Sequence, residues 1–214
     1  MNPNHLEDRI RWGLNVAARA TGAVTSAYRP RGAEHPLAAE NRFLRLYAAF
    51  GGVDGKFSRS NAYGDALWRG IFDAAYTQPG DYLVQQNAIW FIAAQPRLLP
   101  TLCVRTTRLI SFTRPAAQTT TGVNSYGGVT AANVTPLMTK WPASVLAAER
   151  ESRPLANLPG DTSASLWTVL VPACPGVVLR TADLMSDDLG RSGVVATTEL
   201  TDLGWRLAVR QATT

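Results

Sequence analysis

The sequence has few of the residues on which metal sites, disulfide scaffolds and membrane spans depend. Its 214 residues include two cysteines, which excludes a disulfide framework and a four-cysteine zinc site. The two histidines, His5 and His35, belong to no metal-binding motif. No apolar run approaches the ~18–20 residues of a membrane-spanning helix, and the N-terminus lacks the pattern of a signal peptide. We therefore expect a soluble protein without a membrane partner or cofactor, made in the cytoplasm with reduced thiols.

Acidic residues are missing from the middle of the chain. None lies between Asp81 and Glu149, although this stretch contains Arg97, Arg105, Arg108, Arg114 and Lys140. The formal net charge is +5, and 19 of the 21 basic residues are arginines. A stretch of one sign favours a surface that faces nucleic acid or an acidic subunit. It also fits a weakly charged β-rich segment that lacks acids by chance. We take the four arginines as candidate contacts to DNA or a neighbouring subunit.

The spacing of apolar residues changes from a helical to a strand period near Gly22. Leu6, Ile10, Leu14 and Ala17 form one apolar stripe, which predicts a helix over about residues 4–20. This helix starts either at the Asn4–Glu7 capping box or at Asn2-Pro3, and Gly22 is its expected stop. Short strand-like segments follow, at residues 23–28, 42–50, 67–76, 81–84, 89–94, 99–106, 109–113, 144–148, 166–171, 177–179, 193–197 and 205–210.

An internal repeat relates the two halves of this β-rich region. Four short matches occur in the same order, with an offset that grows from 99 to 105 residues: 67–68 with 166–167, 81–83 with 183–185, 92–93 with 195–196, and 103–105 with 208–210. The order predicts two copies of one small hairpin-based unit, without helical crossovers. We predict an N-terminal helix (1–22), a first β-barrel unit (23–114), a linker or extended loop (115–143) and a second β-barrel unit (144–214). The fold class is mainly β with an N-terminal α-helix and two related small antiparallel β-barrel or sandwich units.

No catalytic motif accompanies this fold. The glycine-rich segment 51–58 resembles a phosphate-binding loop, but Phe50 and Phe57 replace its first glycine and its magnesium-binding serine or threonine. Cys103 lies in an apolar run and Cys174 lies between prolines, so both are expected to be structural. We expect no enzyme activity and no bound metal.

The runs Gly80-Asp81-Tyr82-Leu83-Val84, Ile89-Trp90-Phe91-Ile92-Ala93-Ala94-Gln95 and Leu98-Leu99-Pro100-Thr101-Leu102-Cys103-Val104-Arg105-Thr106 resemble head–tail connector proteins of tailed bacteriophages. These are the adaptor, stopper or head-closure proteins of the neck. Residues 66–114 carry most of the resemblance, and residues 166–211 carry a weaker one. The chain is about twice as long as the simplest such proteins and adds an N-terminal helix, which leaves the role within the neck open.

The resemblance implies a virion structural protein located in the neck or tail. It implies a self-assembled ring of six or twelve copies that joins the portal or adaptor to a tail protein and continues the channel for packaged double-stranded DNA. The alternative is a single-stranded nucleic-acid-binding β-barrel module, because Trp90, Phe91 and Phe112 alternate near the arginines. Trp90 is accordingly a fifth candidate contact residue. Trp90 and Phe91 are expected on opposite faces of one strand, one in the core and one against a neighbour.

Overall fold

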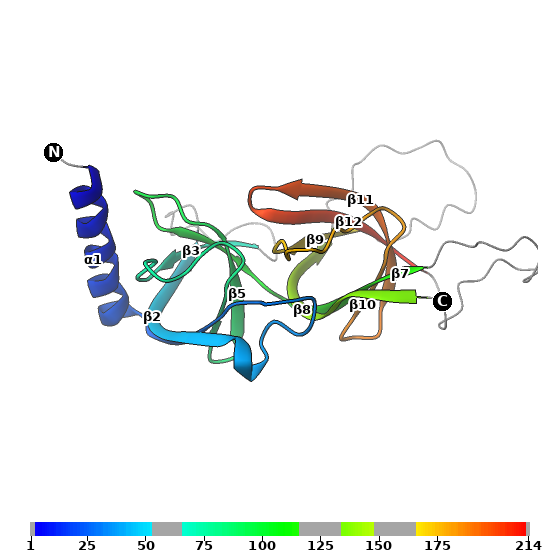
Figure 1. Ribbon diagram of the computed structural model, residues 1–214, viewed down its shortest axis with the longest axis horizontal. Coiled ribbons are helices and arrows are strands. Elements are labelled where there is room, and N and C mark those ends of the chain that lie inside the picture. Colours follow the sequence, from blue (N-terminus) through cyan, green and yellow to red (C-terminus); the bar gives the residue numbers. More distant parts are fainter. Residues whose placement is uncertain (1–2, 53–65, 116–133, 148–165, 213–214) are drawn as a thin grey trace, which may run out of the picture.

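The structure, a computed structural model, describes residues 3–52, 66–115, 134–147 and 166–212. It confirms the predicted fold class, with one N-terminal helix and two antiparallel β-barrels. Figure 1 shows the helix at one end of the long axis, followed by the first barrel and then the second. Helix α1 (Pro3–Thr21) begins at Pro3, the second of the two predicted starts.

The first barrel is built from six strands, which are β1 (Ala23–Tyr28), β2 (Arg42–Gly52), β3 (Leu67–Ile71), β4 (Tyr82–Gln85), β5 (Ala88–Ala94) and β6 (Thr101–Arg105). A short 3-10 turn, η1 (Ala39–Asn41), precedes β2. The order around the barrel is β1-β2-β3-β6-β5-β4, and β4 pairs with β1 to close it. Alternate residues of β2, including Leu44, Leu46 and Phe50, point inward and pack against the buried interior.

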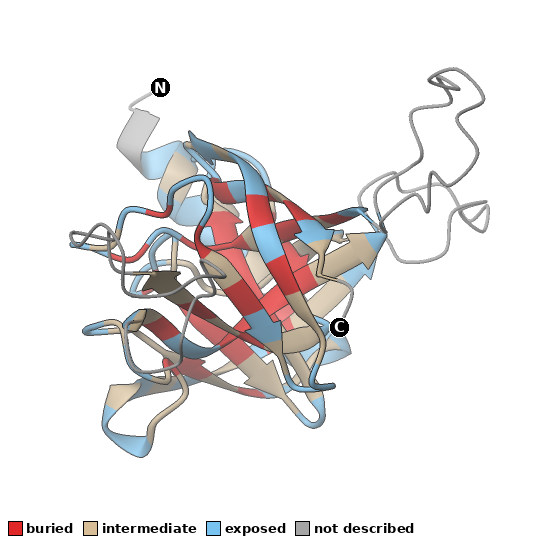
Figure 2. Ribbon diagram, turned by 90° about the vertical axis from the view of Figure 1, so that its right-hand side faces the viewer, coloured by how far each residue is buried: buried red, intermediate tan, exposed pale blue. Residues whose placement is uncertain are grey.

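The second barrel is built from β7 (Arg108–Pro115), β8 (Val134–Ala147), β9 (Leu166–Val171), β10 (Leu184–Asp187), β11 (Ser192–Thr201) and β12 (Gly204–Gln211). Its order is β7-β8-β9-β12-β11-β10, with β10 pairing back to β7. Figure 2 looks onto this barrel and shows buried residues running through the strands, interleaved with exposed ones. This alternation is what a closed sheet with a packed interior requires.

The two barrels have the same strand order when β7 to β12 are matched with β1 to β6. All four sequence matches fall on equivalent strands: β3 with β9, β4 with β10, β5 with β11, and β6 with β12. The predicted internal repeat is therefore confirmed at the level of topology.

The limits of the repeat differ from those predicted. β7 lies almost wholly within the predicted first unit, 23–114, but it pairs with β8 and β10 of the second barrel. The first ten residues of β8 lie in the predicted linker, 115–143, of which residues 116–133 are outside the described part. Closure of each barrel depends on pairing between strands distant in sequence, which no local sequence pattern reveals. Residues 177–179 are not a strand either, because they belong to the loop before β10.

The connection between the barrels is the dipeptide Thr106-Thr107, and it is held at both ends. The Thr106 N–H donates to the Ile89 carbonyl oxygen of the first barrel at 2.9 Å. The Thr107 N–H donates to the Ala143 carbonyl oxygen of the second barrel at 2.8 Å. The Thr107 hydroxyl also accepts the Val145 N–H at 2.9 Å. These bonds fix the backbone at the point where the chain passes from one barrel to the other.

The barrels share one hydrophobic core across their contact. Tyr82 of β4 points out of the first barrel, and its hydroxyl donates to the Pro142 carbonyl oxygen at 2.8 Å. Its ring lies edge-on to Trp141, with centroids 6.0 Å apart. The Trp141 indole in turn donates to the Ala33 carbonyl oxygen at 2.9 Å. Full burial strongly disfavours the charged form and raises the pKa of Tyr82 well above its ordinary value. The part of the first barrel's outer face that carries Tyr82 is therefore interior to the whole molecule.

Helix α1 packs beside β2 and β3 and ends at a close contact. Ala18 is fully buried, and the Gly22 N–H donates to the Ala18 carbonyl oxygen at 2.8 Å. A Cβ atom on Gly22 would lie 2.4 Å from the Ala48 carbonyl oxygen of β2. Gly22 thus ends the helix, as predicted, and allows the helix end to approach the barrel backbone.

Candidate interaction surfaces

Arg114, one of the predicted contact residues, is held by an acidic side chain of its own barrel. Its Nε and Nη2 donate to the two carboxylate oxygens of Asp183 at 2.7 and 2.9 Å. Nη2 also donates to the Val178 carbonyl oxygen at 2.7 Å. The hydrogen bonds to Asp183 raise the pKa of Arg114, although burial acts in the opposite direction. Arg114 therefore holds the loop before β10 in place, and its guanidinium is engaged within the chain.

The first barrel repeats this arrangement at the equivalent position. Arg29, which follows β1, donates from Nε and Nη2 to the Asp81 carboxylate, both at 2.8 Å. Its Nη2 also donates to the Tyr76 carbonyl oxygen at 3.0 Å. The Gln78 N–H donates to Asp81 at 2.9 Å, as the Arg180 N–H donates to Asp183 at 2.7 Å. We call each set an Arg–Asp clamp.

The clamps explain part of the sequence repeat in physical terms. The Asp81 and Asp183 side chains are only 1% and 2% exposed, so each needs a positive partner and several donors. The residues before them, Gly80 and Ala182, both have positive φ, at 94° and 70°. Each turn places a carboxylate at the entrance to the fourth strand of its barrel, opposite the arginine at the end of the first strand.

The other three predicted arginines lie in separate surroundings. Arg97, in the β5–β6 loop, is 82% exposed and pairs with Glu7 of α1 at 3.4 Å. Arg105 ends β6, is exposed, and lies 5.6 Å from the ring centre of Trp68. Arg108 opens β7 and is half-buried, because the loop before it is only two residues long. Within the described residues, neither Arg105 nor Arg108 forms an ion pair.

Trp90 is buried in the first barrel and is not a surface contact. It is 6% exposed, and its ring stacks on Phe50 with centroids 3.9 Å apart and an interplanar angle of 5°. Phe91 points to the other side of β5 and packs in the core shared with the second barrel. The predicted opposite orientation of these two residues is confirmed. The second barrel covers the outer face, so both aromatics are buried.

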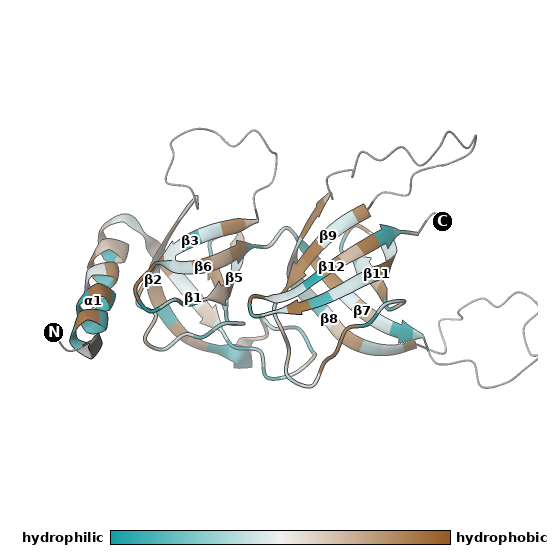
Figure 3. Cartoon of the chain, turned by 90° about the horizontal axis from the view of Figure 1, so that it is seen from above, coloured by the Kyte–Doolittle hydropathy of each residue, from teal (hydrophilic) through white to brown (hydrophobic). Residues whose placement is uncertain are grey.

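The outer face of α1 is an apolar surface that the sequence analysis did not single out. Trp12 and Val16 are 69% and 47% exposed, whereas Ile10, Leu14 and Ala17 lie on the side that meets the barrel. Figure 3 shows α1 standing beside the first barrel, with hydrophobic residues distributed around it. The i, i+4 spacing of Trp12, Val16 and Ala20 indicates this second stripe in the sequence. The structure is needed to show that the other face packs on the barrel and that this stripe has no partner within the described chain.

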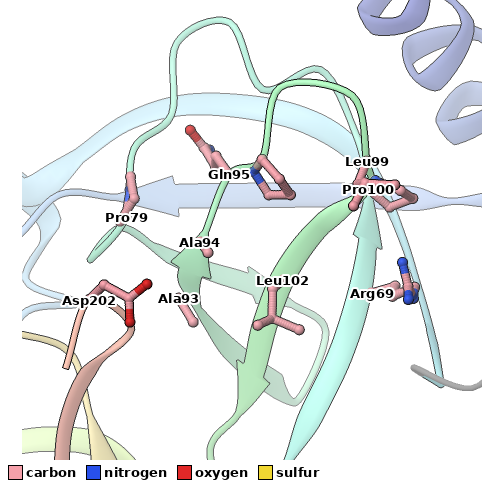
Figure 4. Close-up of a pocket in the computed structure, with 10 residues that line it drawn as sticks. Arg69, Pro79, Ala93, Ala94, Gln95, Leu99, Pro100, Leu102 and Asp202 are labelled. Carbon is pink, nitrogen blue, oxygen red and sulfur yellow. The ribbon is translucent and has the colours of Figure 1, made fainter.

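A pocket of about 430 Å³ lies where the first barrel meets the β11–β12 hairpin (Figure 4). Residues from β3, β5, β6 and the adjoining loops line one side, and Asp202 from the hairpin tip lines the other. Most of the lining is apolar: Arg69, Pro79, Ala93, Ala94, Gln95, Pro96, Leu99, Pro100, Leu102 and Asp202. Next to Asp202, the side chains of Leu200 and Leu203 are 57% and 37% exposed. No local sequence pattern indicated this pocket, because its two sides come from different barrels.

A third surface lies on the outer face of β2. Phe43 and Tyr47 are 37% and 47% exposed, with exposed Arg45 between them. Arg29 lies over the Phe43 ring at 4.5 Å. Alternate residues of a strand share one face, so the three side chains follow a single line. This pattern of aromatic and basic residues is the one the sequence analysis assigned to Trp90 and its neighbours.

The remaining reactive side chains are buried or dispersed. Cys103 and Cys174 are free and buried, and burial raises the pKa of both thiols, which disfavours the reactive thiolate. In the part of the chain that the structure describes, no three His, Cys, Asp or Glu residues lie together as a metal site. Over the same residues, no helix is long and apolar enough to cross a membrane. Comparison of the chain with protein-family models, curated proteins and solved structures gave no match.

Proposed function

We propose that this protein is a structural component of the neck of a tailed bacteriophage virion. It assembles into a ring of six or twelve copies between the portal or adaptor and a tail protein. The ring continues the channel for packaged double-stranded DNA, and the protein has no catalytic role. The resemblance of residues 66–114 to neck proteins supports this proposal, because these residues supply most of a closed barrel, β3 to β6.

The observation that carries the proposal is the combination of two barrels packed into one body with apolar surfaces left uncovered within the described residues. Thr106-Thr107 and the Tyr82–Trp141 contact join the barrels into one unit. The α1 face and the leucines at the β11–β12 tip are exposed on different parts of that unit. A subunit of a closed ring needs two different surfaces, one for each neighbour. Exposed apolar patches mark such contacts.

The basic residues have a role in this proposal that can be tested. Arg105 and Arg108 flank the connection between the barrels and form no ion pair within the described residues. We assign them to the channel or to an acidic neighbour, with phosphate contacts that carry no base readout and so let DNA slide.

The test replaces Arg105 and Arg108 with Glu in the phage that encodes the protein. Arg210→Glu is the control, because Arg210 is an exposed arginine near the end of β12, the strand of the second barrel that corresponds to β6, and it lies away from the connection between the barrels. Heads that package DNA and then leak it would assign these arginines to the channel, and intact heads without tails would assign them to a subunit contact. Normal yields of DNA-filled, tailed particles would show that they are only solvated.

The second candidate function is binding of single-stranded nucleic acid, and the outer face of β2 favours it. Bases stack on exposed aromatic side chains while arginine meets the phosphates. Phe43 and Tyr47 replace the buried Trp90 as the stacking residues in this candidate. Salt-dependent binding of an oligothymidine by the purified protein, lost in Tyr47→Ala, would support it. No binding at low salt would exclude this second function.

A further inference from the structure

The outer face of α1 has the composition of a docking helix. Trp12 and Val16 lie one turn apart, and both are exposed on the side away from the first barrel. Asp8 and Arg9, both exposed, lie one turn before Trp12 and on either side of it. An aromatic anchor between charges of opposite sign fits an apolar pocket that has charges at its rim.

The pocket between the barrels has the complementary composition. Its apolar lining includes Leu99, Pro100 and Leu102, and Asp202 and Arg69 lie on opposite sides of it (Figure 4). Its volume of about 430 Å³ is within the range of about 300–1,000 Å³ of pockets that enclose large ligands. The pocket can therefore accept a bulky side chain, and Asp202 at its rim can pair with a basic residue beside that side chain.

We propose that α1 of one copy of this chain docks in the inter-barrel pocket of the next copy. Trp12 enters the pocket as the anchor, and Arg9 faces Asp202. The exposed Leu200 and Leu203 beside Asp202 extend the apolar surface toward Val16. The opposite charges of Arg9, beside Trp12, and Asp202, at the pocket rim, favour a second copy as the occupant.

This contact rests on the proposed ring and specifies how its subunits meet. The helix and the pocket are different surfaces, so the contact is heterologous and passes from each copy to the next until the ring closes. Each subunit uses its helix toward one neighbour and its pocket toward the other. The same geometry explains why the helix has an apolar stripe on each of its two sides.

The test measures the concentration at which the purified protein assembles, by mass photometry, for wild type and variants. Trp12→Ala and Leu99→Ala are expected to raise that concentration by at least about 30-fold, as for the loss of an interface anchor. Leu189→Ala is the matched control, because Leu189 is 56% exposed in the β10–β11 turn and outside the pocket. All these side chains are exposed, so circular dichroism should show unchanged folding.

A charge reversal tests the register of the contact. Arg9→Asp and Asp202→Arg should each weaken assembly, and the double variant should restore it, because the pair is then reversed at every interface. Rings that persist unchanged in Trp12→Ala would overturn this contact while leaving the proposed ring intact. A wild-type protein that stays monomeric at every concentration, and also when mixed with heads or tails of its phage, would overturn both.

Discussion

The Arg–Asp clamps allow the internal repeat to be tested by its energetics. The Asp81 carboxylate accepts two hydrogen bonds from Arg29 and one from the Gln78 N–H, and it is 1% exposed. Asp81→Asn replaces one acceptor oxygen with a donor that faces another donor and leaves the guanidinium without its counter-charge. Asp183→Asn does the same to Arg114 in the second barrel.

The expected loss follows from the geometry of the clamp. A hydrogen bond to a charged group contributes about 1.5–3 kcal/mol, and removing one partner of a buried pair costs about 3–5 kcal/mol. The arginines are 37% and 30% exposed, so water compensates for part of this loss. We expect each variant to lose about 2 kcal/mol of unfolding free energy, or roughly 4–8 °C in Tm for a chain of this size.

Urea unfolding followed by tryptophan fluorescence measures this loss. Glu199→Gln is the control, because the Glu199–Arg206 pair is 55–65% exposed and its removal should change the free energy of unfolding by less than about 0.5 kcal/mol. The reasoning is refuted if the Asp81 and Asp183 variants lose no more than this control. It is also refuted if only one barrel depends on its clamp.

Five further substitutions, at four positions, have defined outcomes in the same unfolding assay. Trp90→Ala should lower the free energy of unfolding by about 3–5 kcal/mol. Trp90→Phe keeps an aromatic ring and removes a buried N–H that has no partner in the described chain, so it should lower that free energy by less than half as much. Gly22→Ala places a Cβ 2.4 Å from a β2 carbonyl oxygen and should lower the free energy of unfolding by about 1–3 kcal/mol. A Cβ at Gly13 meets nothing within 4 Å, so Gly13→Ala should raise that free energy by about 0.5–1 kcal/mol. Burial acts to raise the pKa of Asp187, but hydrogen bonds from Arg191 and the backbone outweigh it and hold that pKa below its ordinary value of about 3.9. Its stabilisation is therefore present above pH ~4 and lost as the pH falls through the lowered pKa, so Asp187→Asn should be destabilising at pH 7 and nearly equal to wild type at pH 2.

Local patterns in the sequence were sufficient to locate most of the strands and the repeat. The alternation of residues 42–50 predicted β2 and its inward face, because strand side chains point to opposite sides in turn. The predicted strand at 81–84 corresponds to β4, and the repeat match at 183–185 marks the start of β10. Turn chemistry and two-residue alternation act over a few residues, so a sequence shows them directly.

The sequence could not show which side chains are paired or covered by segments far away along the chain. Arg114 was predicted to contact DNA or a subunit, but its partner Asp183 lies 69 residues further along the chain. Trp90 was predicted to be a contact residue because alternation cannot show that both faces of β5 are covered, one by the barrel interior and one by the second barrel. Trp12 was missed because the opposite stripe of its helix gave the stronger amphipathic pattern.

Assembly of the purified protein tests the proposed neck ring most directly. Mass photometry of the wild-type chain, with electron microscopy of the same sample, measures the number of subunits and shows any central opening. With a chain mass of 23.1 kDa, a ring of six or twelve copies has a mass of about 139 or 277 kDa. We predict one of these masses, and a ring whose central channel admits duplex DNA. A protein that remains at 23.1 kDa at every concentration, and also when mixed with heads or tails of its phage, would contradict the proposal.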